Sequence, residues 1–462
     1  MLTIWREDPV PQKSPGGAVA LLREMFGQRS VTRLFLPILG EQAMNTLVSF
    51  VSTVMVGHAG TVAISAVGTV SALNNCIINS LISVASGVAA VTAQYLGAGQ
   101  REKASRAVAQ FAAAVVLFST ALMLTLLLFA RQILAGLFGA AEPAVLEGAR
   151  VYLAMSACSV PFAAIMAILS ATLRGCGNSR VPMTAALVMN AVNTGLGAAL
   201  IYGAGLGVTG AGLGLLTARI AGAAWLVVLM LRPGFDLPLR EFFPIRWSVI
   251  RPIFSIGVPM GIDTAMFNGG KLLVQVFMTG LGTGVIAANS VVNSVISLIE
   301  IPGNAMNLLT ITLVGFSVGA HDYRAARRHG FLSMLACILL QAAVSLPMWF
   351  LIPWLVGVFS SDPAVIPDAV TVCRSFVLVI ALWGPAFTTP SALRAAGDVR
   401  FTVLSSLAVM WVVRVGLSWL FGVVMHGGLL GIWIALYTDW VVRAALFIPR
   451  LASKRWENRA VT

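Results

Sequence analysis

The sequence predicts an all-α integral membrane protein with twelve transmembrane helices, arranged as two homologous lobes of six helices each. Three observations predict it: an extreme apolar composition, twelve apolar segments of membrane-spanning length, and an internal repeat. Of the 462 residues, 58% are hydrophobic and only 10% are charged, against about 25% charged residues in an ordinary soluble domain. The mean hydropathy is +0.91. A soluble domain of this length cannot hide so much apolar surface, so lipid must surround most side chains.

The spans follow from the spacing of the interruptions in the apolar sequence. A helix needs about 20 largely apolar residues to cross a bilayer, and the chain divides into twelve such segments where charged residues, glycine or proline cluster. In order, the expected spans are 31–57, 62–96, 103–135, 144–173, 180–202, 208–230, 249–279, 284–319, 323–358, 364–394, 401–424 and 429–449. The even number places both ends of the chain on one side of the membrane.

The connections between spans alternate in charge, which orients the protein. Six of them carry no Lys or Arg, whereas the other connections and the two ends of the chain carry 23 of the 30 basic residues. Basic loops are retained on the cytoplasmic side of a membrane. We therefore expect a cytoplasmic tail at 1–30, a cytoplasmic inter-lobe linker at 231–248 and a cytoplasmic tail at 450–462, in the inner membrane of a bacterium. Topology thus explains the net charge of +13, and no nucleic-acid partner is expected.

Several stretches of the first lobe, 31–230, recur in the second, 249–449, at a nearly constant offset. The aligned stretches are Pro37 with Pro259 and Gly97 with Gly319 at an offset of 222, EPAVLEGA (142–149) with DPAVIPDA (362–369) and LRGCGNSR (173–180) with LRAAGDVR (393–400) at 220, and GVTG (207–210) with GLLG (428–431) at 221. Because six is an even number, both lobes have the same orientation. They are expected to be related by a pseudo-twofold axis along the membrane normal, as in many secondary transporters.

The sequence lacks the common motifs of metal-dependent and nucleophilic enzymes. The five cysteines form no CxxC pair, and no HExxH or GxSxG motif occurs. Such motifs are typical of metal sites and of nucleophilic catalysis. We therefore expect no catalytic residues, no cofactor and no metal site other than one for sodium.

The motifs resemble those of a known family, the multidrug and toxic compound extrusion (MATE) transporters. The resemblance rests on LPILGEQ followed by TVMVGHAGTVAISAVG, on AQYLGAGQREKA with its partner VGAHDYRAA, and on LRGCGNSRVP with LRAAGDVRF. It implies a twelve-helix antiporter that alternates between inward-open and outward-open states and expels cationic, often aromatic, compounds in exchange for sodium ions or protons. One departure stands out: many bacterial members carry an aspartate where this chain has Ser52.

Two carboxylates occupy the same place in the two lobes. Glu41 follows Pro37 by four residues and Asp263 follows Pro259 by four residues, again at an offset of 222. We expect them to face the cleft between the lobes and to bind the coupling proton or sodium ion, helped by carbonyl oxygens that the prolines leave free. The alternative is that each acid satisfies backbone or Asn donors within its own lobe. Glu300 joins the predicted coupling site, because it and Asp263 each lie roughly 18 residues, or about 28 Å, from the GLGT turn.

Polar and soft side chains near these acids are expected to line the cavity. The expected polar lining is Asn45, Asn75, Lys271, Asn289 and Asn293, and the expected substrate contacts are Met44, Met260, Met266 and Phe267. For the amides and methionines the alternative is ordinary packing between helices, and for the lysine it is neutralisation of the carboxylates. Asp439 and Arg443 are spaced as an intrahelical ion pair and are interpreted as structural. An arginine in the cavity, such as Arg414, would disfavour cationic substrates.

The sequence therefore predicts a secondary active efflux antiporter that exports cationic, amphipathic drugs or metabolites in exchange for protons or sodium ions. Its partners would be small organic cations and membrane lipid, its energy source an ion gradient, and its state a monomer. A flippase of lipid-linked saccharides is the alternative within transport, and it would require a strongly basic cavity. An intramembrane enzyme is a third class, which the missing motifs disfavour.

Overall fold

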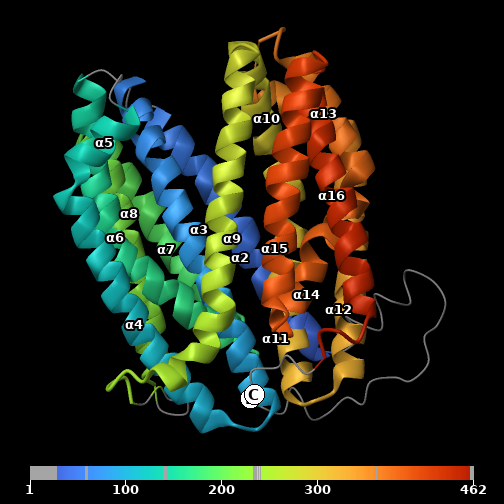
Figure 1. Cartoon of the computed structure of the whole chain (residues 1–462). Coiled ribbons are helices and arrows are strands. Elements are labelled where there is room, and N and C mark those ends of the chain that lie inside the picture. The colour runs from blue at the N-terminus through green and yellow to red at the C-terminus, as the bar shows by residue number, and fades with distance from the viewer. Residues whose placement is uncertain are drawn as a thin grey trace. The chain divides into compact units, whose positions relative to one another are not determined.

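The computed structural model describes residues 29–57, 61–138, 143–232, 237, 239, 241–360 and 362–457, and all regular secondary structure in these ranges is helical (Figure 1). The expected tail at 1–30 lies outside the described residues except for its last two positions. Residues 58–60 and 139–142, two short stretches at expected connections, also lie outside them, as do residues 458–462 of the second tail.

The six spans expected in the first half of the chain each correspond to one helix or to two consecutive helices. They are α2 (Arg29–Gly57), α3 (Thr61–Gly97), α4 (Arg101–Leu128) with α5 (Ala130–Phe138), α6 (Pro143–Gly175), α7 (Arg180–Ala198) with the π-helix η2 (Ala199–Gly203), and α8 (Gly207–Met230). The predicted ends agree with the observed ones to within three residues, because charged residues and glycines mark where each apolar segment stops.

The second half also follows the prediction, but with more interruptions. Its helices are α9 (Trp247–Gly280), α10 (Thr283–Ile299) with α11 (Ile301–Gly319), α12 (Tyr323–Phe359), α13 (Ile366–Val379) with η3 (Ile380–Leu382), η4 (Gly384–Thr388) and α14 (Thr389–Ala395), α15 (Val399–Ala408) with η5 (Val409–Val415) and η6 (Ser418–Val424), and α16 (Gly428–Ala452). Here η3 is a 3-10 helix, whereas η4, η5 and η6 are π-helices.

Length and apolarity support the membrane assignment. Among the described residues, ten helices are long and apolar enough to cross a bilayer, and the bent pair α13–η3 and η4–α14, with an angle of 58° between its parts, makes eleven. The helix α9 has 34 residues and is long enough to cross, but it carries Asp263 and Lys271. The twelve predicted spans are thus all helical, and the all-α membrane fold class is confirmed.

The interruptions in the second half have a physical cause in proline. Pro302 has no N–H to donate and its ring clashes with the carbonyl of residue 298, so the helix is interrupted at Glu300. Pro385 and Pro390 act in the same way along the bent tenth span. Glu300 and Trp383 consequently lie at helix breaks rather than within regular turns.

The described residues form two compact units. We call one the N-unit (the described residues of 40–96 and 100–261) and the other the C-unit (the described residues of 1–39, 97–99 and 262–462). The helices α2 and α9 each contribute residues to both units.

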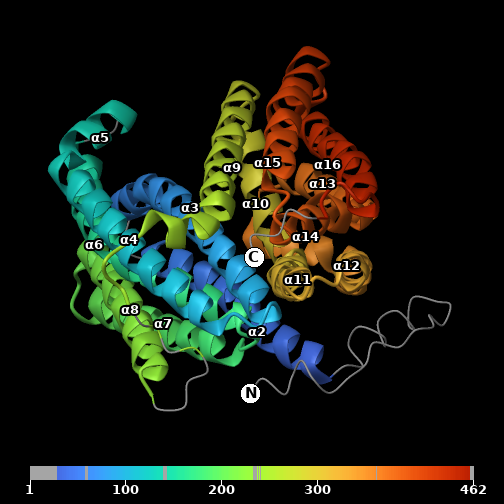
Figure 2. The ribbon, with the colours of Figure 1, turned by 60° about the horizontal axis from the view of Figure 1, so that its bottom comes forward.

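Within the N-unit, α6 packs against α4 and α8, and α7 lies beside α8 (Figures 1 and 2). One apolar cluster of this unit joins α3, α5 and α6, and a second joins α6, α7 and α8. The backbones of α3 and α9 approach closely here, since a Cβ atom on Gly87 would lie 2.6 Å from the nitrogen of Gly257. Small residues are typical where membrane helices pack closely.

Within the C-unit, α11 packs along α12, and α13 packs against α10, α12 and α16 (Figure 2). A single large apolar cluster includes buried residues from α10, α11, α12, α13 and α16 together with the first turns of α2. Aromatic rings are frequent in it: Phe376 makes edge-to-face contacts with Trp433 and Trp440 at centroid distances of 6.2 and 5.5 Å. This aromatic core forms one side of the cavity described next.

Candidate functional site

A cavity of about 500 Å³ lies within the C-unit, a volume suited to a drug-sized molecule. Its charged wall residues are Lys271 of α9, Glu300 between α10 and α11, and Arg414 of η5. Its aromatic wall residues are Phe267, Phe376, Trp383, Phe387, Trp433 and Trp440, and its amides are Gln275, Asn289, Asn293, Asn304 and Asn307. The cavity therefore combines an apolar aromatic surface with a few convergent polar groups.

Glu300 is held at the meeting point of two broken helices. The indole Nε1 of Trp383 donates a hydrogen bond to its Oε1 at 3.2 Å. Lys271, on the same cavity wall, attracts the carboxylate electrostatically. Discontinuous helices often build the binding sites of membrane transporters, because the interrupted backbone lets polar groups point into a cavity.

Two cations of this wall, and Arg443 outside it at 5.8 Å, lie over the ring of Phe267. The Nζ atom of Lys271 lies 5.1 Å from the centroid of Phe267, and the Cζ atom of Arg414 lies 5.3 Å from the same centroid. Arg414 is 8% exposed. Neither cationic group makes a hydrogen bond or an ion pair with a residue in the described ranges. The ring of Phe267 is therefore the group that these two cations of the cavity wall contact.

Amide side chains supply further polar groups to the cavity wall. Trp433 Nε1 donates to Oδ1 of Asn289 at 3.2 Å, and Nδ2 of Asn289 donates to Oε1 of Gln275 at 3.4 Å. Asn293 Nδ2 donates to the backbone carbonyl of Asn289 at 2.8 Å. The Oδ1 atom of Asn307, also in the wall, is buried and has no hydrogen-bond partner among the described residues.

Outside the cavity, each of the two repeat-related acids forms an ion pair within its own unit. In the N-unit, Arg174 Nη1 lies 3.2 Å from Oε1 of Glu41, and both side chains are nearly buried. In the C-unit, Arg394 Nη2 donates to Oδ2 of Asp263 at 2.6 Å. Both acids thus have an arginine partner within their own units, whereas the alternative interpretation expected backbone or Asn donors there. Their role in ion coupling remains a prediction.

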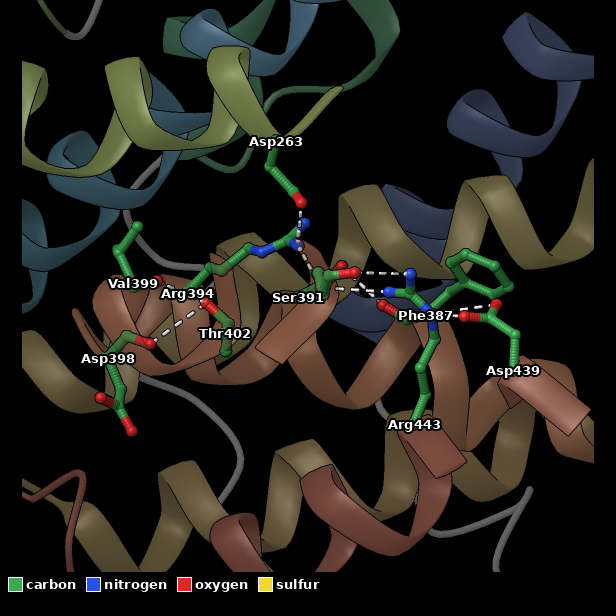
Figure 3. A network of polar contacts seen from close by, with 10 residues as sticks. Asp263, Phe387, Ser391, Arg394, Asp398, Val399, Thr402, Asp439 and Arg443 are labelled. Atoms are coloured by element: carbon green, nitrogen blue, oxygen red, sulfur yellow. Dashed lines mark hydrogen bonds and ion pairs between the residues drawn. The ribbon is translucent and has the colours of Figure 1, made fainter. Parts of the chain in front are cut away.

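The ion pair of the C-unit belongs to a larger network (Figure 3). Arg394 also lies 3.5 Å from the hydroxyl of Ser406, and Arg443 Nη1 donates to that hydroxyl at 3.0 Å. Arg443 Nε lies 3.0 Å from Oδ1 of the fully buried Asp439. The predicted intrahelical pair is confirmed, and Ser406 joins it to the pair of Asp263.

The N-unit has a polar network of its own, built around neutral partners. Arg219 Nη1 donates to Ser159 Oγ at 2.6 Å and to Asn74 Oδ1 at 3.3 Å. Asn190 Nδ2 donates to Oδ1 of the predicted lining residue Asn45 at 2.9 Å. The buried Arg219 is thus stabilised by the dipoles of a hydroxyl and an amide group.

The predicted site residues divide between the cavity wall and other places. Glu300, Lys271, Asn289, Asn293 and Phe267 line the cavity. The wall does not include Glu41, Met44, Asn45, Asn75, Met260, Asp263 and Met266. Asn75 is exposed, Met260 is buried and Met266 is 40% exposed.

Sequence reasoning missed the tryptophans of the wall and the arginines that pair with the acids. Trp383, Trp433 and Trp440 lie in apolar spans, where an aromatic residue gives no sign of whether it faces lipid or a cavity. Arg174 and Arg394 lie at the ends of expected spans beside basic connections, where the charge pattern predicts cytoplasmic residues rather than partners of the acids. The two arginines occupy equivalent positions in the two LR motifs, at an offset of 220, just as Glu41 and Asp263 occupy equivalent positions in the two lobes. This shared recurrence was the signal that the sequence offered.

The fold and the cavity together define a polytopic helical membrane protein of the duplicated kind that secondary transporters use. The chain belongs to the MatE family, whose model matches residues 37–198 and again residues 259–420. The double match confirms both the internal repeat and the family resemblance. The protein is accordingly a multi-pass membrane transporter.

Relatives and solved structures agree with this family. The chain is 28% identical over 446 residues to a probable multidrug resistance protein NorM of Thermotoga maritima, and 26% identical over 439 residues to the uncharacterized transporter YisQ of Bacillus subtilis. These alignments cover 94% of this chain, and 94% and 96% of the relatives.

Two solved structures have the same fold at 19% identity. An outward-facing multidrug resistance MATE transporter of the MOP superfamily matches with a TM-score of 0.87, and a MOP superfamily transporter of Pyrococcus furiosus, described as having a binding pocket of reverse polarity, matches with 0.86. Each match covers 98% of this chain and the whole of the other.

Proposed function

We propose that the protein is a secondary active efflux antiporter of the bacterial inner membrane, with both termini in the cytoplasm. It exports amphipathic, aromatic small molecules in exchange for protons or sodium ions by alternating access. The cavity of the C-unit carries this proposal, because about 500 Å³ with aromatic walls and a few polar groups suits such a molecule. The names of the relatives, which include multidrug resistance proteins, support efflux as the direction.

Organic cations are the cargo that the family resemblance implies, and no cofactor other than an ion gradient is proposed. Glu300 is the carboxylate of the cavity wall and would supply their counter-charge. Lys271 and Arg414 in the same wall repel cations, however. The sign of the cargo's charge therefore needs a test of its own.

The acids provide three places where a coupling ion can act. Glu41 and Asp263 each form an ion pair with an arginine of the LR motif, and Glu300 accepts a hydrogen bond from Trp383. A proton that binds to one of these carboxylates would weaken its pairing. Coupling needs only that ion and cargo prefer different conformations of the protein.

A flippase of lipid-linked saccharides is supported by the two cations of the wall alone. A saccharide headgroup needs a polar, hydroxyl-binding surface, whereas much of this wall is aromatic. The size and the apolar character of the cavity favour the antiporter.

The direct test is transport in proteoliposomes. The purified full-length protein is reconstituted, and the movement of a fluorescent cationic dye and of an anionic dye of similar size is recorded under an imposed proton gradient or an imposed sodium gradient. Glu41→Gln, Asp263→Asn and Glu300→Gln are compared with the wild type. Glu147→Gln is the control, because Glu147 is 69% exposed and, among the described residues, forms an ion pair only with Arg150 on the surface.

We expect one of the two gradients to drive transport, and at least one of the three neutralised acids to remove the dependence on that gradient. Dye movement that ignores both gradients in the wild type would contradict antiport. Because Glu41→Gln removes the carboxylate that pairs with Arg174, the double variant Glu41→Gln/Arg174→Gln separates coupling from stability: it restores folding but leaves coupling lost if the acid binds the ion.

A further inference from the structure

We infer that the cavity of the C-unit binds an amphipathic aromatic anion, with its carboxylate or similar oxyanion between Lys271 and Arg414. The inference rests on the proposed transport function for its physiological meaning, and it names the substrate class. It depends on the charges of the cavity wall, on their lack of partners and on the aromatic surface beside them.

The balance of charge in the wall is positive. Lys271 and Arg414 face one acid, Glu300. Asp439, an acid near Arg414, is already engaged by Arg443 in a buried ion pair at 3.0 Å. Within the part of the chain that the structure describes, the wall therefore holds one more cation than anion.

The two cations also have unused hydrogen-bond donors. A guanidinium has five N–H donors and an ammonium has three, yet neither group has a hydrogen-bond or ion-pair acceptor among the described residues. Arg414 is 92% buried, since its exposed fraction is 8%. A buried cation with no acceptor within a membrane-spanning helix is costly and is a functional-site candidate.

Their geometry suits one shared anion. Both lie within 5.3 Å of the centroid of Phe267, so they are at most about 10 Å apart. Like charges at this distance in an apolar surrounding repel each other, and an oxyanion between them would remove that repulsion. Arginine binds a carboxylate through two parallel hydrogen bonds, which gives it a preferred position.

The aromatic wall selects the rest of the ligand. Trp383, Trp433, Trp440 and Phe387 offer ring faces on which a flat apolar body stacks. The Trp383 indole N–H is already donated to Glu300, and that of Trp433 to Asn289. Their remaining surface is apolar, so the predicted ligand has a charged end and an aromatic body.

The test is equilibrium binding to the purified full-length protein in detergent, which needs no ion gradient. Three naphthalene probes of similar shape are titrated by calorimetry: 1-naphthaleneacetate, its neutral amide 1-naphthaleneacetamide, and (1-naphthylmethyl)trimethylammonium. We expect the anion to bind at least tenfold more tightly than the amide and the cation. Arg414→Gln and Lys271→Gln should each weaken binding of the anion about tenfold and leave binding of the amide unchanged.

Two further variants keep the test decisive. Arg414→Lys retains the positive charge and should retain most of the anion affinity, which separates charge from misfolding. Arg374→Gln is the matched control, because Arg374 lies over Trp349 in the same unit and is not part of the wall. Its anion affinity should equal that of the wild type.

Tighter binding of the cation, lost in Glu300→Gln, would overturn the inference, as would anion binding that is equal to amide binding or unaffected by Arg414→Gln. The proposed function fails separately. Anion binding that depends on Arg414, together with no gradient-driven transport in proteoliposomes, would reject antiport and leave the anion site standing.

Discussion

The N-unit and the C-unit derive from the same repeat, yet corresponding helices differ in continuity and in the polar groups that they carry. The second span of the first half, α3, runs unbroken from Thr61 to Gly97, whereas its counterpart in the C-unit is interrupted at Glu300. At the offset of 222, Glu300 corresponds to Ile78 and Pro302 corresponds to Ser80. Two substitutions thus accompany a continuous apolar helix in one unit and a broken, charged cavity wall in the other.

A second difference concerns the length of a helix. The repeat offset is 220 at Arg180 and Arg400 but 221 at Gly207 and Gly428, so the second lobe has one additional residue between these positions. A π-helix accommodates an additional residue, because its hydrogen bonds run from i to i+5. The π-helix η5 corresponds to residues 189–195 of the regular helix α7. Arg414 lies in η5, so the insertion accompanies a cavity cation that has no equivalent in the N-unit.

The largest expected effect is the loss of a buried ion pair, and it should be greater in the C-unit. Arg443→Gln leaves Asp439 without its cationic partner at a position with no solvent exposure, and we expect it to lower the free energy of unfolding by about 3–5 kcal/mol. Arg174→Gln in the N-unit should cost less, because Glu41 keeps a side-chain exposure of 11%. Unfolding in mixed micelles measures both.

The matched control for this prediction is the double variant Arg443→Gln/Asp439→Asn, in which no charge remains unpaired. It should recover most of the lost stability. An equal loss in the single and the double variant would show that the packing of Arg443, rather than its charge, stabilises the C-unit.

The close backbone contact of the N-unit gives the next effect. A Cβ atom at Gly257 would lie 2.6 Å from the carbonyl oxygen of Val84, so Gly257→Val should destabilise the protein by about 1–3 kcal/mol through overpacking. Gly284→Ala in α10 is the comparison, because nothing lies within 4 Å of its Cβ position. We expect this substitution to be neutral or slightly stabilising in a thermal denaturation measurement.

The hydrogen bond across the broken helices of the C-unit should matter for transport more than for folding. Trp383→Phe removes the donor to Glu300 and should cost about 1.5–3 kcal/mol, the range for bonds to charged groups, and it should also reduce the transport rate. Trp225→Phe in the N-unit is the comparison, because it removes a hydrogen bond to Thr184 at an exposed tryptophan. Unchanged transport in Trp383→Phe would contradict a role for this wall in cargo binding.

The smallest effects should come from charges in the first turns of the spans. Arg106→Gln breaks an exposed ion pair with Glu241 in the N-unit, which should contribute about 0.2–1 kcal/mol. Arg327→Gln in the C-unit should cost more, because that guanidinium also donates to the carbonyl of Ser453 and lies 5.9 Å from the ring of Trp456. The order of the two denaturation midpoints checks this comparison.

The sequence predicted the spans well and the site only in part, for reasons that lie in particular residues. Apolar segments end at charges and glycines that are visible in the sequence, so helix boundaries were accurate. Glu300 and Lys271 were found because a charge in a span is rare. Trp383 and Trp433 were not, because the same residue is common against lipid and in cavities. Proline in the spans was visible, but the sequence does not show which prolines break a helix and which, like Pro161 inside α6, are tolerated.

The pairing of Glu41 with Arg174 and of Asp263 with Arg394 has a consequence for biosynthesis. The partners are separated by 133 and 131 residues, and ribosomes add about 5–20 residues per second. Each acid is therefore synthesised roughly 7–27 s before its arginine. During that interval the carboxylate must stay protonated, remain near the interface or be shielded by the insertion machinery. The buried acid of each lobe gains its arginine partner only when the fourth span of that lobe is inserted.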